Sequence, residues 1–210
     1  MYTDQELLAF LPSRRKSLLT KAIGKKLIEI ERFFEQDEIS FITNEKLPAV
    51  DFFALNVGIT KLIFESNLSH NFSIYGGQLS IILLPERDFE QKPYFDGQWY
   101  QLSQAKYLST PDLSNCLGQT CRDVRLWTLQ EDFESDEAKE VAVSYLLANG
   151  NELFYCIYLH EDLDSDYLLL KPDVDLTKAA SCFSLVLGEY IELEPEQLTS
   201  IGLSSKSFTG

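Results

Sequence analysis

The chain has 210 residues and a formal net charge of −15 at pH 7, because its 33 acidic residues outnumber its 18 basic ones. Hydrophobic residues make up 45% of the chain and aromatic residues 12%, which is enough apolar material for a packed core and excludes a wholly disordered chain. No apolar run reaches the roughly 18 residues of a membrane-spanning helix, and the charge disfavours nucleic acid as a partner because it would repel phosphates.

Two helices are predicted at the N-terminus. Thr3 and Glu6 have the spacing of a capping box, which begins a short helix that ends before Pro12. A second helix is predicted from Ser13 to about Glu35, because apolar residues recur there at helical spacing. Its opposite face carries the basic residues Arg14, Lys21, Lys25 and Arg32. A basic face of this kind usually contacts solvent, but it can also dock on phosphate, an anionic membrane or an acidic protein.

The middle of the chain is expected to form strands joined by loops. Ile39–Thr43 alternates like a short strand, whereas residues 48–64 fit either a helix or a strand. Gly76-Gly77 is expected to turn a hairpin between Phe72–Tyr75 and Gln78–Leu84. Further short strands are predicted at Trp99–Leu102, Lys106–Leu108 and Val124–Leu129.

A second hairpin is predicted in the last third of the chain. It joins Val141–Ala148 to Glu152–Leu159 through Asn149-Gly150-Asn151, because Asn-Gly readily adopts the positive φ angles of a tight turn. Tyr167–Leu170 is expected to add another strand. Asp175 is then expected to cap a helix over Leu176–Leu187 that ends at Gly188.

These elements predict an α+β fold formed mainly by an antiparallel β-sheet of hairpins. We expect a single domain over residues 1–210, with an N-terminal helical segment at 1–36, a β-rich body at 37–210 and a C-terminal helix.

The negative charge is concentrated in residues 130–200, which hold seventeen acidic and three basic residues. Residues 12–28, in contrast, hold six basic residues and no acidic one. We expect the acidic third to present a partner-binding surface, because clustered carboxylates attract basic proteins and accelerate their association. The residues predicted to form this surface are Glu131, Asp132, Glu134, Asp136, Glu137, Glu161, Asp162, Asp164 and Asp166.

Two patterns in the sequence resemble metal sites but lack residues that such sites need. Cys116 and Cys121 lack the second pair of soft ligands that zinc needs, so free thiols are expected in a reducing compartment and a loop disulfide in an oxidising one. Asp162, Asp164 and Asp166 resemble the start of a calcium loop, but Tyr167 stands where such a loop needs glycine. A solvated acidic turn is the better interpretation, and we expect neither a metal nor a cofactor.

The charge pattern predicts an acidic protein-binding module, such as an immunity-type inhibitor of a cationic toxin or a nucleic-acid mimic. No known nucleophile or phosphate-binding motif occurs, which argues against the common enzyme classes. The alternatives are a hydrolase or transferase with an unrecognised carboxylate site, and a structural or adaptor subunit. Copies of the chain can also associate through the basic helix and the acidic surface. The first residues lack the features of a secretory signal, which predicts a cytoplasmic location.

Overall fold

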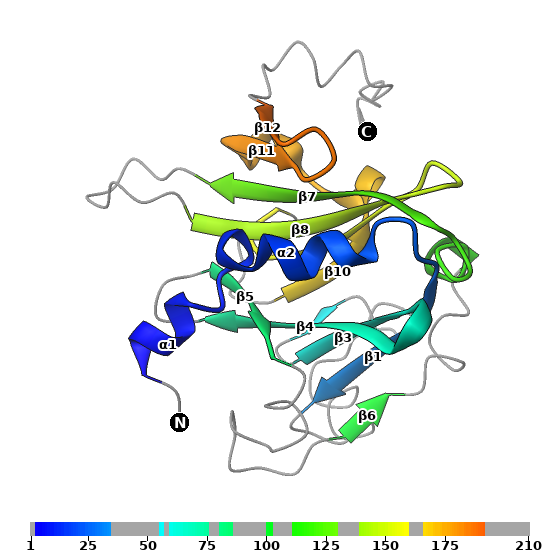
Figure 1. The fold of residues 1–210 in the computed structure, drawn as a ribbon, viewed down its shortest axis with the longest axis horizontal. Helices are drawn as coiled ribbons and strands as arrows, with labels where there is room; N and C mark the ends of the chain where they lie inside the picture. Colours follow the sequence, from blue (N-terminus) through cyan, green and yellow to red (C-terminus); the bar gives the residue numbers. More distant parts are fainter. Residues whose placement is uncertain are drawn as a thin grey trace, which may run out of the picture.

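Two antiparallel β-sheets face one another across a shared core (Figure 1). The computed structural model describes residues 3–34, 55–56, 59–75, 80–85, 100–102, 111–129, 139–159 and 166–191. The smaller sheet has the order β5 (Ser80–Leu84), β4 (Leu68–Tyr75), β3 (Ile59–Phe64), β1 (Leu27–Phe34) and β6 (Tyr100–Leu102). The larger sheet has the order β12 (Glu189–Ile191), β11 (Ser181–Ser184), β7 (Cys121–Leu129), β8 (Lys139–Leu147), β9 (Glu152–Cys156), β10 (Asp166–Leu170) and β2 (Leu55–Asn56).

Aromatic rings from the facing sheets form the centre of the core. Phe72 of β4 stacks on Tyr155 of β9, with ring centroids 5.0 Å apart. Phe64 and His70 of the smaller sheet contact the ring of Tyr145 on β8, at centroid distances of 5.4 and 5.8 Å. Because each buried aromatic side chain contributes roughly 2–3 kcal/mol by leaving water, these contacts hold the two sheets together.

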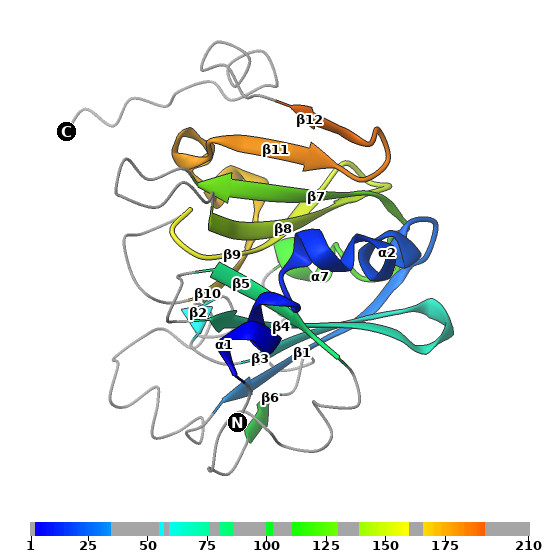
Figure 2. The same cartoon turned by 60° about the vertical axis from the view of Figure 1, so that its left-hand side comes forward.

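A helical N-terminal segment packs on both sheets (Figure 2). Its elements are α1 (Asp4–Leu8), α2 (Lys16–Leu19) and the short 3-10 helices Pro12–Arg15 and Thr20–Ala22. The predicted capping box is confirmed, since the Thr3 and Glu6 side chains each bond the other's backbone N–H. Leu7 packs on the face of the smaller sheet that points away from the core, whereas Leu19 and Ala22 are buried in the core. The remaining short helices are α7 (Pro111–Ser114), Glu65–Asn67, Lys171–Asp173 and Leu176–Lys178.

The predicted helix over Ser13–Glu35 is wrong beyond its first half. Gly24 adopts a φ of +83°, in the left-handed region that glycine enters without strain, and the helical segment ends there. The chain continues as β1, which pairs with β3 and β6. The basic residues predicted to share one helix face are therefore separated, because Arg32 lies on β1 and is fully buried.

The predicted C-terminal helix over Leu176–Leu187 is also wrong. Asp175 does cap a turn by accepting a hydrogen bond from the Thr177 backbone, but this 3-10 turn ends at Lys178. The following residues form β11, which pairs with β7 and extends the larger sheet. Gly188, at a φ of +67°, lies in the hairpin between β11 and β12 instead of ending a helix.

The hairpin predictions are confirmed by the strand pairing. Tyr75 pairs with Ser80 on either side of the predicted Gly76-Gly77 turn, and β8 pairs with β9 through a turn in which Gly150 has a φ of +88°. Strands also lie at the predicted positions around Trp99–Leu102, Val124–Leu129 and Tyr167–Leu170. The part of 48–64 that is described is strand, and the predicted strands Ile39–Thr43 and Lys106–Leu108 lie outside the described residues. The fold is therefore predominantly antiparallel β-sheet with helical segments at the N-terminus.

Candidate functional site

Two acidic segments of the chain are attached to the same end of the larger sheet. Strands β7, β8, β9 and β10 are consecutive antiparallel neighbours, so the last residues of β7 and β9 lie beside the first residues of β8 and β10. Leu129 pairs with Lys139 across residues 130–138, and Cys156 pairs with Tyr167 across residues 160–165. We call this end of the sheet the acidic end.

Eight of the nine residues predicted to bind a partner belong to these two segments and lie outside the described residues. They are Glu131, Asp132, Glu134, Asp136, Glu137, Glu161, Asp162 and Asp164. The ninth, Asp166, is the first residue of β10, and its side chain is fully buried. Asp166 is therefore not on the surface and is not available to a partner.

Asp166 instead forms an ion pair that links the two sheets beneath the acidic end. Its Oδ2 atom accepts a hydrogen bond from Nη2 of Arg32 on β1 at 3.3 Å, and both side chains have an exposed fraction of 0%. The phenol of Tyr155 faces this pair. Burial, and then the negative charge of Asp166, raise the pKa of Tyr155 well above its ordinary value.

A second carboxylate at the acidic end fastens the N-terminal segment. Glu140 of β8 accepts hydrogen bonds from the backbone N–H of Ser13, at 2.8 Å, and from the Ser13 hydroxyl. Burial raises the pKa of Glu140, and the bonds from Ser13 with the nearby charges of Lys16 and Arg14 only partly offset it. This acidic residue therefore has a structural role inside the molecule.

A network of charged side chains lies on the face of the larger sheet that points away from the smaller one. Arg125 donates from Nε to Asp123 at 3.1 Å and from Nη1 to Glu152 at 3.2 Å, and Nζ of Lys171 lies 3.7 Å from Glu152. Burial alone would lower the pKa of Arg125, but the charges and bonds of Glu152 and Asp123 outweigh it and raise that pKa. The described buried carboxylates of this network are thus paired with cations.

The four cysteines are free and buried. Burial raises the pKa of Cys121 and of Cys182 to about 12, so neither forms the reactive thiolate near neutral pH. Among the described residues, no group of three histidine, cysteine, aspartate or glutamate side chains has the geometry to hold a metal ion. No described helix is long and apolar enough to cross a membrane.

We expect none of the four thiols to react with Ellman's reagent within minutes in the folded protein, and all four to react once the protein is unfolded in guanidinium. In guanidinium, the rate at which the protein thiols react with the reagent should follow the rate of unfolding. A thiol that reacts rapidly under native conditions would show that Cys116, Cys121, Cys156 or Cys182 is accessible.

Sequence reasoning did not predict which polar side chains are buried, and Arg32 and His70 are the two with the largest consequences. Arg32 has a visible signal, because Ile28-Glu29-Ile30-Glu31 alternates with a period of two and so predicts a strand that carries Arg32 to the same face as Ile30. His70 has no comparable signal, since its partners are distant in sequence.

Comparison of the chain with protein-family models, with curated proteins and with solved structures found no match. The functional argument therefore depends on the residues and their arrangement.

Proposed function

We propose that this protein is a cytoplasmic acidic binding module that captures a basic protein partner at its acidic end. The observation that supports this proposal is topological. Two segments far apart in sequence, residues 130–138 and 160–165, are both joined to neighbouring strands at one end of the larger sheet. Together they carry eight acidic residues, with one histidine and no lysine or arginine.

The physical effect of such an arrangement is on association. Carboxylates that share one end of a molecule create a negative potential that attracts a cationic surface and can raise the association rate by orders of magnitude. The sheet provides a rigid base, because the strands that hold the two segments are buried and paired along their length. A toxin with a cationic active site, or a protein that binds nucleic acid, has the required complementary charge.

The experiment is a capture from source lysate, with identification of the partner and titration of the purified pair. We expect capture at about 50 mM salt and its loss at about 500 mM, because added salt shortens the screening length of exposed charges to a few ångströms. A variant with amides in place of all eight carboxylates of the two segments should bind the purified partner at least about tenfold more weakly.

The matched control removes two negative charges toward the opposite end, with Glu65→Gln and Glu189→Gln, and is compared with Asp162→Asn and Asp164→Asn at the acidic end. It should keep the affinity within about threefold, because exposed charges act mainly within a Debye length. Equal loss of affinity in both variants, a partner that is not basic, or capture that ignores salt would each contradict the proposal. If the partner's DNA binding is blocked in the complex, the module acts as a nucleic-acid mimic.

A further inference from the structure

Exposed apolar side chains gather at one hairpin, at the end of the larger sheet opposite the acidic end. Four large hydrophobic residues are exposed among the described residues, and three of them lie in or beside the turn between β11 and β12. They are Val186, Leu187 and Tyr190, with exposed fractions of 52%, 62% and 64%. The turn is anchored to β7, because the backbone N–H of Val186 donates to Asp123 at 3.1 Å and that of Leu185 to the Val124 carbonyl at 2.9 Å.

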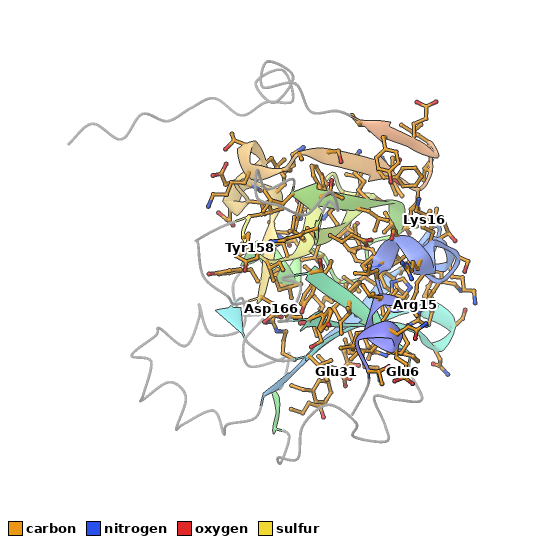
Figure 3. All side chains as sticks on the ribbon, turned by 90° about the vertical axis from the view of Figure 1, so that its left-hand side faces the viewer. Glu6, Arg15, Lys16, Glu31, Tyr158 and Asp166 are labelled. Atoms are coloured by element: carbon orange, nitrogen blue, oxygen red, sulfur yellow. The ribbon has the colours of Figure 1, made fainter. Side chains whose placement is uncertain are left out.

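Basic residues of the N-terminal segment lie beside this hairpin. The carbonyl of Lys25 accepts a hydrogen bond from Cys121, the first residue of the same strand β7, at 2.8 Å, and the helical turn that holds Lys21 contacts β7. The ammonium of Lys16 lies 3.7 Å from the ring centroid of Phe183 and 5.9 Å from that of Tyr190. Figure 3 shows Lys16 directly next to the hairpin, and Figure 2 shows the turn above the N-terminal segment.

We propose that Lys21, Lys25, Val186, Leu187 and Tyr190 form a docking surface for an anionic lipid membrane. The basic and the apolar residues of this surface match the headgroup layer and the acyl-chain boundary of a membrane, respectively. Lysines are attracted by anionic headgroups, and apolar side chains at the tip of a turn enter the boundary between headgroups and acyl chains.

The shape of the surface favours a membrane over a protein as the occupant. Val186 and Leu187 lie at the tip of a hairpin, so the apolar surface is convex. A stable protein interface buries about 800 Å² on each partner and needs a complementary pocket for its apolar anchors. A bilayer needs neither, because its interface deforms around a small apolar group.

Glu189 is exposed in the same hairpin, but the two segments of the acidic end carry eight acidic residues and lie away from the tip of the hairpin. The turn of the hairpin is bonded to Val124, which pairs with Tyr145 of β8, and six residue steps separate Tyr145 from Lys139 at the acidic end, about 20 Å at 3.3 Å per step. Exposed charges are screened over about 8–10 Å at physiological salt, so the acidic end lies roughly two screening lengths from the tip of the hairpin. The molecule can therefore bind a membrane at one end and present its acidic end to the solvent.

The test is flotation of the full chain with vesicles of phosphatidylcholine alone or of phosphatidylcholine mixed with phosphatidylserine. We expect the protein to float only with the mixed vesicles, and less as salt rises. Lys21→Gln with Lys25→Gln should weaken binding about thirtyfold, and Val186→Ser with Leu187→Ser at least about tenfold. The control pair Lys139→Gln with Lys178→Gln removes the same charge near the other end of the sheet and should change binding less than about twofold.

Three results would overturn the inference: no flotation of the wild-type chain with mixed vesicles, equal weakening by the control pair, or no effect of the serine pair. Self-association without lipid that the serine pair abolishes would also overturn it, since the surface would then be an interface between copies. All the substituted side chains are exposed or half-buried, so unchanged thermal unfolding of each variant confirms that the fold is intact. This test is independent of the capture experiment at the acidic end.

Discussion

Replacing Arg32 by methionine is expected to lower the free energy of unfolding by about 3–5 kcal/mol, because it leaves the carboxylate of Asp166 buried without a cation. Both side chains have an exposed fraction of 0%, so water cannot solvate the remaining charge. Equilibrium urea unfolding at neutral pH measures the loss. A matched control is Lys26→Met, which breaks the ion pair with Glu65 at 4.0 Å, where the side chains are 53% and 43% exposed. The control should cost less than about 1 kcal/mol.

The double variant Arg32→Met with Asp166→Leu distinguishes the contribution of the ion pair itself from the cost of leaving one buried charge unpaired. We expect it to recover most of the lost stability, because a buried ion pair often contributes no more than apolar side chains of similar volume. Two observations favour recovery. The pair has a single hydrogen bond, of 3.3 Å, and neither Nε nor Nη1 of Arg32 has a hydrogen-bond partner. A single variant as stable as the wild type would show that Asp166 is compensated by another group. A double variant as unstable as the single one would show that the pair itself is essential.

The same ion pair shows how far the fold could be predicted from the sequence. Leu27–Phe34 contains a helical stripe and a strand alternation at once, and local propensity does not choose between them. Two facts decide: Gly24 ends the helix in a left-handed conformation, and strands β3 and β6 are present to pair with β1. The partners are long-range, so the pairing that overrides the helical pattern is not visible in any local window.

The C-terminal error has the same origin. Asp175 is a good helix cap and does cap a turn, yet Ser181–Ser184 joins β7 because the edge of the larger sheet is open to it. The hairpins were predictable because their signals are local, as the positive φ of Gly150 illustrates.

The acidic segments were evident from composition alone, whereas their common attachment required the strand order. The burial of Asp166 is a property that composition cannot show, because it depends on Arg32, which is distant in sequence.

His70 carries the second large expected effect. Its Nε2 atom lies 3.2 Å from the carbonyl of Leu18, which only accepts, so Nε2 bears the hydrogen. Its Nδ1 atom lies 2.7 Å from the hydroxyl of Tyr145 and is therefore the acceptor of that hydrogen bond. Both ring nitrogens are thus satisfied in the neutral form. Burial lowers the pKa of His70 to about 3, and the positive charges of Arg15 and Lys21 add to the effect.

The unfolded chain binds a proton on this residue near pH 6.5 and the folded chain does not until about pH 3, so stability falls as pH decreases between these values. From about pH 7.5 to about pH 5.5, His70 should remove about 1.4 kcal/mol from the free energy of unfolding. Urea unfolding of the wild type and of His70→Gln over this range measures the contribution as the difference in slope. Because carboxylates such as Glu140 titrate in both proteins, their effects cancel in that difference. Equal slopes would mean that His70 takes up its proton in the folded protein at the same pH as in the unfolded chain, and that the hydrogen bond from Tyr145 does not hold it neutral.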